Sequence, residues 1–79
     1  DEMELYKILK EWRAGEAQLL GYPPYIIASN QLLADIAKSN PKNIEELSQL
    51  KGMGKRKIKD YGEEILLILE NFYDVLKPL

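Results

Sequence analysis

The stretch from Ile44 to Leu69 decides the fold, and it reads IEELSQLKGMGKRKIKDYGEEILLIL. Apolar residues recur at helical spacing on both sides of the short segment Lys51-Gly52-Met53-Gly54. Two glycines one residue apart permit positive φ angles and let the backbone approach another helix or a ligand closely. Because the segment is too short to separate the two flanking helices, the stretch predicts that they pack against each other.

The start of the second of these helices is basic. The segment between Lys51 and Lys59 carries five positive charges and no negative charge. Cations oppose the dipole at a helix N-terminus, where the first N–H groups also have no partner within the helix. A bound phosphate would neutralise these cations and accept hydrogen bonds from the free N–H groups. The glycines would leave those N–H groups accessible. A second interpretation stays open, because such turns also serve close packing and exposed lysines usually form a solvated face.

The same stretch resembles a helix-hairpin-helix element. That pattern places two apolar residues before Gly-apolar-Gly and a basic helix start after it. The matching positions here are Leu47, Leu50, Gly52, Met53 and Gly54. The resemblance implies contact with a nucleic-acid backbone.

Composition excludes most catalytic chemistry. The chain has 79 residues with no cysteine and no histidine, so it lacks disulfides, thiolates, histidine-based triads and most zinc sites. The acids Glu45 and Glu46 are explained by a helix start, and Gly52-Met53-Gly54-Lys55 lacks the glycine spacing of a nucleotide-binding loop. We therefore expect no catalytic residue, no metal and no cofactor in this chain.

Length and charge limit the partners. A chain of 79 residues predicts one domain, residues 1–79, and its opening Asp-Glu-Met suggests a piece excised from a longer protein. The net charge of −2, from 11 basic and 13 acidic residues, predicts weak and local contact with nucleic acid. No apolar run approaches the roughly 20 residues of a membrane span, so no membrane partner is expected.

The remaining pattern predicts an all-α bundle of four or five helices. The first helix is expected over residues 2–20, and its apolar stripe includes Leu5, Leu9, Trp12, Leu19 and Leu20, among others. We expect Trp12 in the core with its N–H bonded to a polar partner. Arg13 is expected on the outer face, and Gly15 at a close approach of another helix.

Capping residues set the other helices. Gly21 fits the position after the first helix, and residues 25–28 are expected as a buried extended connection or a single turn. Ser29 is expected to cap a helix that runs to residue 38. Asn43 is expected to cap the next helix with Glu46 in a capping box. The last helix is expected over residues 55–76, with Gly62 at a close helix contact.

The last helix has more apolar residues than one face requires. Leu66, Phe72, Val75 and Leu76 follow Ile65 in its second half. This excess predicts either a sandwiched helix or an apolar surface that another domain covers.

The ordered set of segments resembles the HRDC domain, the helicase-and-RNase-D C-terminal domain. The matching segments are LYKILKEWR over 5–13, PPYIIASN over 23–30, IEEL over 44–47 and LKGMG over 50–54, followed by Lys57 and Tyr61-Gly62. The resemblance spans essentially Leu5 to Phe72 and implies a compact helical bundle. It also implies an accessory module, without an active site of its own, within a RecQ-type or superfamily I helicase or an RNase D.

The resemblance implies weak binding to single-stranded or branched DNA in many members. Partners would be that DNA and the helicase core of the same chain, and we expect a monomer. The parent would be an ATP-dependent DNA helicase, cytoplasmic on a bacterial nucleoid or nuclear in a eukaryote. The alternative is a protein-docking or regulatory module without DNA binding.

Candidate residues for the DNA contact divide into two kinds. Glycine N–H groups and basic side chains would hold phosphates, and an exposed aromatic ring would stack on a base. Tyr22 is the ring expected to be exposed, whereas Tyr25 and Tyr61 are expected in the core. The predicted site is Lys51, Gly52, Gly54, Lys55, Arg56, Lys57 and Tyr22.

Overall fold

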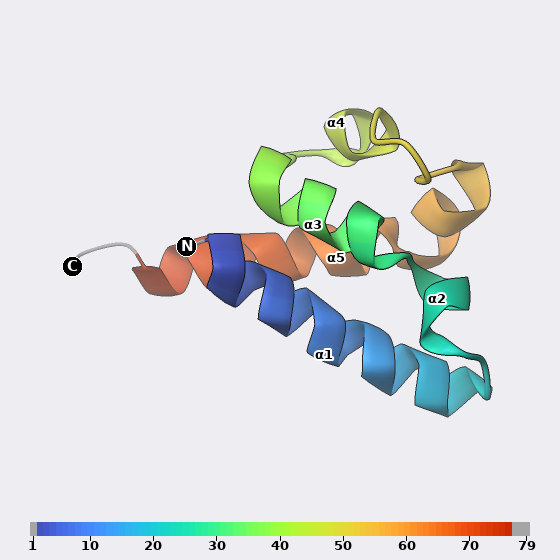
Figure 1. Ribbon diagram of the computed structural model, residues 1–79. Helices are drawn as coiled ribbons and strands as arrows, with labels where there is room; N and C mark the ends of the chain where they lie inside the picture. The colour runs from blue at the N-terminus through green and yellow to red at the C-terminus, as the bar shows by residue number, and fades with distance from the viewer. Residues whose placement is uncertain (1, 77–79) are drawn as a thin grey trace.

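The described part of the chain folds into five helices (Figure 1). A computed structural model describes the backbone of residues 2–76 and the side chains of residues 2–75. The helices are α1 (Glu2–Leu20), α2 (Pro24–Ile27), α3 (Asn30–Ser39), α4 (Ile44–Ser48) and α5 (Lys55–Leu76). No strand occurs in the described part of the chain. The predicted all-α class and helix number are confirmed.

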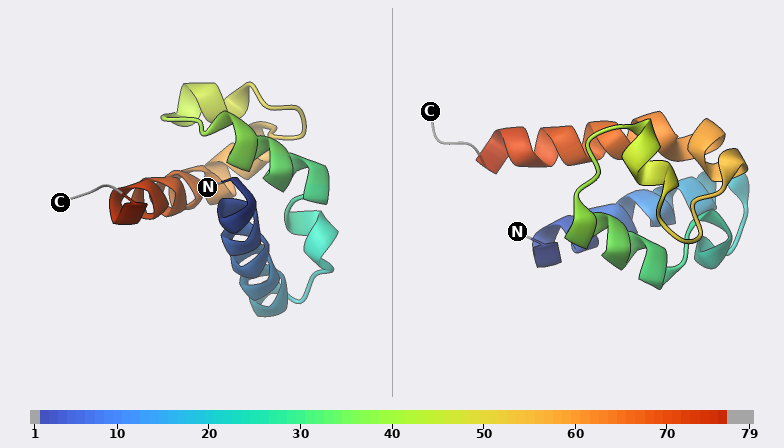
Figure 2. Two further views of the ribbon diagram at one scale, coloured as in Figure 1. Left: turned by 60° about the vertical axis from the view of Figure 1, so that its left-hand side comes forward. Right: turned by 90° about the horizontal axis from the view of Figure 1, so that it is seen from above.

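Two long helices carry the architecture. α1 and α5 run in opposite directions, so both termini lie at one end of the molecule (Figures 1 and 2). α3 and α4 lie on one side of this pair, and α2 lies at the end away from the termini. The connections that carry the candidate site therefore gather at the end opposite the termini.

The core draws side chains from all five helices, because each helix has one apolar stripe. The largest fully buried side chains are Leu5, Leu9, Ile27, Leu33, Ile36, Leu47 and Ile65. Met53 from the turn before α5 is also buried. The turn is therefore anchored in the core.

Capping chemistry starts α3 and α4 where the sequence predicts. The Ser29 hydroxyl accepts from the Leu32 N–H at 3.0 Å, and the Asn43 side chain accepts from the Glu46 N–H at 2.8 Å. The Glu46 carboxylate accepts from the Lys42 N–H at 2.8 Å. In an ideal capping box this acceptor would serve Asn43 itself, so the box is shifted by one residue.

The segment around α2 resolves one open alternative. Residues 24–27 form a single helical turn, which is the second of the two predicted forms. Ile27 and Ala28 are buried, but Tyr25 and Ile26 are exposed, so the prediction of a wholly buried connection is wrong. One turn has two faces, and only one of them reaches the core.

The glycines divide into those that fit the prediction and one that does not. Gly21 has φ +74°, and the Tyr22 N–H bonds to the Ala17 carbonyl at 2.9 Å, as in a Schellman end. At Gly62 a Cβ would lie 2.9 Å from Cδ1 of Ile44, which confirms close packing of α4 on α5. At Gly15 a Cβ would meet nothing within 4 Å, so the predicted close approach there is wrong.

The last turn of α1 departs from its predicted stripe. Leu19 and Leu20 are exposed, because the C-terminal turns of α1 diverge from α5 (Figure 1). Trp12 is half-buried against the core, but its Nε1 has no hydrogen-bond partner among the described residues. The expected polar partner of Trp12 is therefore absent from the part of the chain that the structure describes.

Candidate nucleic-acid interface

The turn between α4 and α5 is fixed from the inside. The Met53 N–H bonds to the Leu50 carbonyl at 3.0 Å, and the Met53 side chain is buried. Gly52 has φ +95°, a conformation that favours glycine, and its Cα faces the Leu32 side chain. Lys51, Gly52 and Gly54 are exposed as a result. Packing of Met53 thus presents these three residues to solvent.

The N-terminus of α5 is open to solvent. Its first helical hydrogen bond runs from the Ile58 N–H to the Gly54 carbonyl at 3.0 Å. The N–H groups of residues 55–57 precede that bond, and no acidic residue lies in the first turn to balance them. Gly54 is exposed and contributes no side chain that covers these donors. An anion is the ligand that this helix end favours.

A surface hollow of about 500 Å³ lies beside this helix end. It is lined by Ser48, Met53, Gly54, Lys55, Ile58 and Lys59. Its walls combine an ammonium pair and a hydroxyl with apolar Met53 and Ile58. The hollow gives a phosphate and part of a sugar room to approach Gly54.

The basic side chains are placed unequally. Lys51, Lys55 and Lys59 are exposed, whereas Lys57 is half-buried. Nε of Arg56 lies 3.0 Å from Oδ2 of Asp60, and the Arg56 side chain is 88% exposed. An exposed ion pair of this kind contributes less than about 1 kcal/mol, so a phosphate can compete for Arg56.

Of the three candidate tyrosines, Tyr25 differs from the sequence-based expectation. Tyr22 is 52% exposed as predicted, but Tyr25 is 68% exposed, so its prediction as a core residue is wrong. Tyr25 faces solvent because Ile27 and Ala28 occupy the buried side of α2. Figures 1 and 2 place α2 at the same end of the molecule as the start of α5. The exposed rings and the basic segment therefore share one end.

Tyr61 is a structural residue. Its ring packs edge-to-face on Trp12, with centroids 5.6 Å apart and planes at 79°. Burial raises the pKa of the Tyr61 hydroxyl, and the nearby Asp60, Glu16 and Tyr22 raise it further against an opposing effect of Arg56. The half-buried position agrees with the prediction of a core role.

Arg13 is a further residue whose sequence-based placement is wrong. It is 8% exposed rather than on the outer face, and its Nη1 donates to the Ala28 carbonyl at 2.8 Å. The bond joins α1 to the end of α2 and so positions Tyr25. Its spacing of four residues from Leu9 and from Ala17 was the available signal, because Arg13 continues that buried stripe.

Two carboxyl groups meet across α1 and α5. Burial raises the pKa of Glu16 above its ordinary 4.5, and Glu64 raises it further through its charge and a side-chain hydrogen bond. Glu16 is half-buried. This acidic pair lies on the same two helices as the Trp12–Tyr61 contact.

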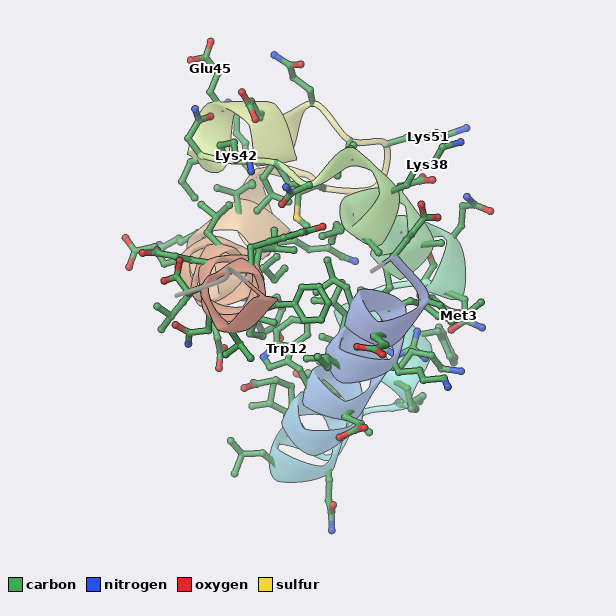
Figure 3. All side chains as sticks on the ribbon, turned by 90° about the vertical axis from the view of Figure 1, so that its left-hand side faces the viewer. Met3, Trp12, Lys38, Lys42, Glu45 and Lys51 are labelled. Atoms are coloured by element: carbon green, nitrogen blue, oxygen red, sulfur yellow. The ribbon has the colours of Figure 1, made fainter. Side chains whose placement is uncertain are left out.

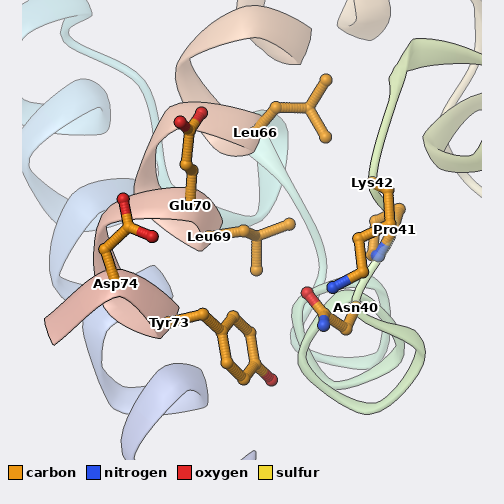
Figure 4. A pocket seen from close by; sticks show the side chains of 8 residues that line it. All are labelled: Asn40, Pro41, Lys42, Leu66, Leu69, Glu70, Tyr73 and Asp74. Atoms are coloured by element: carbon orange, nitrogen blue, oxygen red, sulfur yellow. The ribbon is translucent and has the colours of Figure 1, made fainter. Parts of the chain in front are cut away.

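Another hollow, of about 270 Å³, lies between the 40–42 loop and α5 (Figure 4). The Tyr73 ring turns toward the loop, and Nζ of Lys42 lies 5.5 Å from the ring centroid. Glu70 and Asp74 also line this hollow from α5. The Lys42 ammonium already contacts the Tyr73 ring, so we assign this hollow a structural role.

The described part of the chain contains neither a metal-binding cluster nor a membrane-spanning helix. No group of three or more histidine, cysteine, aspartate or glutamate residues is placed there to hold a metal ion. Among the described helices, none is both long enough and apolar enough to cross a membrane.

Comparison with known proteins places the chain in a family. The model of the HRDC domain matches residues 2–69. The chain is 35% identical over 63 residues to the ATP-dependent DNA helicase RecQ of Bacillus subtilis, and 32% identical over 78 residues to ribonuclease D of Sphingobium indicum. Those matches cover 80% and 98% of this chain, but 11% and 20% of the relatives.

A solved structure supports the same assignment. The D. radiodurans RecQ HRDC domain 3 superposes with a TM-score of 0.88 at 29% identity, over 92% of this chain and 96% of that one. The five-helix order and the family match agree. The chain belongs to the HRDC domain family.

Proposed function

We propose that this HRDC domain is an accessory contact for single-stranded or branched DNA within a longer helicase. The N-terminus of α5 binds backbone phosphates, as a helix-hairpin-helix element would, and carries no sequence code. The observation that carries the proposal is the start of α5, where N–H groups without a helical partner, the exposed Gly54 and four basic side chains coincide without an acid in the first turn. The charges oppose the helix dipole, and a bound phosphate balances them.

The stacking partner in this proposal includes Tyr25 as well as Tyr22. Both rings are exposed and lie at the end where α5 begins. An aromatic face stacks on any base, so the pair adds affinity without sequence preference. The phosphate contacts remain Lys51, Gly52, Gly54, Lys55, Arg56 and Lys57.

The contact is weak. Two or three phosphates on a single strand give a salt slope of only about −1.4 to −2.1, and affinity in the non-specific range of roughly 10⁻⁴ to 10⁻⁶ M. The parent is an ATP-dependent DNA helicase, with an RNase D-type exonuclease as the alternative, since relatives of both names match this chain. Tethering raises the effective concentration of a weak site beside the parent's own DNA site, on the bacterial nucleoid or in the nucleus.

The test is an amide-shift titration of the labelled chain with a short single-stranded DNA at low and high salt. We expect shifts at residues 51–59 and near Tyr22 and Tyr25 that fade with salt. The variant Lys55→Glu/Arg56→Glu should lower affinity at least about tenfold and reduce the salt slope by about 1.4, at about 0.7 per phosphate.

The matched control reverses two other charges. Lys7→Glu/Lys10→Glu changes net charge by the same amount on exposed positions of α1. Equal loss in both variants would mean that only net charge matters and would reject the α5 site. No shift at millimolar DNA would favour the alternative, a docking module without DNA binding.

A further inference from the structure

A hollow of about 480 Å³ lies between the first half of α1 and the second half of α5. It is lined by Glu4, Ile8, Ile68, Asn71, Phe72 and Val75. Val75 is 83% exposed and Ile8 is 39% exposed, so the floor and one wall are apolar and open to solvent. Among these lining residues, the charged side chain is the carboxylate of Glu4. The predicted apolar excess of α5 is thus partly on the surface, although the Leu76 side chain lies outside the described residues.

The contact line between the two helices continues away from this hollow. Trp12 packs on Tyr61 further along the same helices, and Glu16 then faces Glu64. Figure 3 shows Trp12 between α1 and α5 on the side away from α4. We call this line, from Glu4 and Val75 to Glu16 and Glu64, the α1–α5 seam.

Charge along α5 changes sign toward the seam. The helix begins with Lys55, Arg56, Lys57 and Lys59, whereas Glu64 lies further along it, one helical turn before Ile68 of the hollow. Glu64 raises the pKa of Glu16 through its charge, so the two carboxylates repel each other across the seam. A cationic group from outside would relieve this repulsion.

The spacing fits a helix. Residues 4 and 16 are twelve apart on α1, so the seam runs about 18 Å, the length of about three helical turns. An apolar groove with charged flanks is the usual receptor for an amphipathic helix. A second copy is disfavoured as occupant, because a two-fold contact places the same acidic surface on both sides.

We propose that the α1–α5 seam binds a basic amphipathic helix of a partner protein. Aliphatic side chains of that helix fill the hollow between Ile8 and Val75, and a Lys or Arg about three turns away pairs with Glu16 and Glu64. This docking site is separate from the proposed DNA contact and does not depend on it.

The test uses the labelled chain and a synthetic helix of about 14 residues, a length that spans the seam at 1.5 Å per residue. Its Leu residues follow helical spacing and its other positions are Lys. A scrambled peptide of the same composition removes the apolar face, and a Glu-for-Lys peptide inverts the charge. We expect shifts at Ile8, Ile68, Asn71 and Val75, with no comparable binding of either control peptide.

Two variants separate the seam from the rest of the surface. Val75→Lys should weaken binding at least about tenfold, because it places a cation in the apolar hollow against a basic helix. The matched control Leu67→Lys alters a 55% exposed leucine of α5 outside the hollow and should change little. Glu16→Gln/Glu64→Gln should weaken binding about threefold and reduce its salt dependence.

The opposing results are distinct. Equal binding of the scrambled peptide, or equal effects of Val75→Lys and Leu67→Lys, overturns the proposal. Self-association of the chain in sedimentation, lost in Val75→Lys, would make a second copy the occupant and also overturns it. Lys55→Glu/Arg56→Glu should leave peptide affinity no weaker, so failure of the DNA proposal remains separable.

Discussion

The two ends of the α1–α5 pair expose different kinds of side chain. The turn end, residues 21–28 and 49–59, exposes glycines, cations and tyrosines. The terminal end, residues 2–9 and 66–75, exposes aliphatic side chains and carboxylates. A net charge of −2 describes neither end. Surface chemistry in this domain is therefore set locally along each helix, and overall charge is a poor guide to its ligands.

The ends also differ in what holds them in place. The terminal end is held by side-chain packing of residues such as Leu5, Leu9 and Leu69. The turn end also depends on the hydrogen bond from Arg13 to the Ala28 carbonyl and on the positive φ angles of Gly21 and Gly52. Single substitutions at the turn end should therefore show which of its contacts matter.

Arg13→Ala should give the largest effect. It leaves the buried Ala28 carbonyl without its donor and removes a packed side chain, so unfolding free energy should fall by about 2 kcal/mol. Urea unfolding measures the loss. Lys10→Ala, an exposed change on the same helix, should cost less than about 0.5 kcal/mol. Equal losses of unfolding free energy in the two variants would show that the hydrogen bond from Arg13 to Ala28 does not stabilise the fold.

Gly52→Ala should be next in size. At φ +95° an alanine is strained, and the expected cost is about 1–2 kcal/mol. The same substitution at Gly15 should instead stabilise the protein by about 0.5–1 kcal/mol, because that glycine is helical and its Cβ position is empty. Thermal unfolding measures the stability of both variants. If both substitutions changed stability in the same direction, the positive φ angle of Gly52 would not be the cause.

Tyr25→Ala should weaken single-stranded DNA binding while leaving stability nearly unchanged. One stacked base contributes about 1 kcal/mol or more, so affinity should fall about fivefold. A fluorescence titration measures it. Val75→Ala removes an exposed side chain at the terminal end and should not alter DNA affinity. If Tyr25→Ala is also silent, the ring is not a stacking platform.

Glu16→Gln should give the smallest effect, and its sign depends on pH. The pKa of Glu16 is raised in the folded state, so that state binds the proton more tightly and stability falls as pH rises above about 4.5. The neutral glutamine should therefore stabilise the protein at pH 7, by roughly 0.5 kcal/mol, with no gain below pH 4.

Unfolding at both pH values is the measurement for this last comparison. Glu64→Gln should give a similar gain, and the double variant should gain less than the sum, because either change ends the repulsion. Destabilisation at pH 7 would show that the two carboxyl groups do not repel.

The helices and their capping residues could be predicted from the sequence alone. Helical spacing, Ser29, Asn43 and Gly21 act within a few residues, so their effects are local and readable. The sequence also located the basic start of α5 and the Gly52 turn, since both lie in one continuous stretch. Whether these residues bind DNA stays a prediction.

Tertiary structure decided which residues at the edges of these apolar stripes are buried. Arg13 is buried because α2 folds back and offers the Ala28 carbonyl, and Tyr25 is exposed because that turn buries Ile27 instead. Leu19 is exposed because α1 diverges from α5, and Glu16 comes near Glu64 because α1 and α5 pack in opposite directions. Each outcome depends on groups far apart in the chain, and helical periodicity carries no information about which distant surface a stripe will meet.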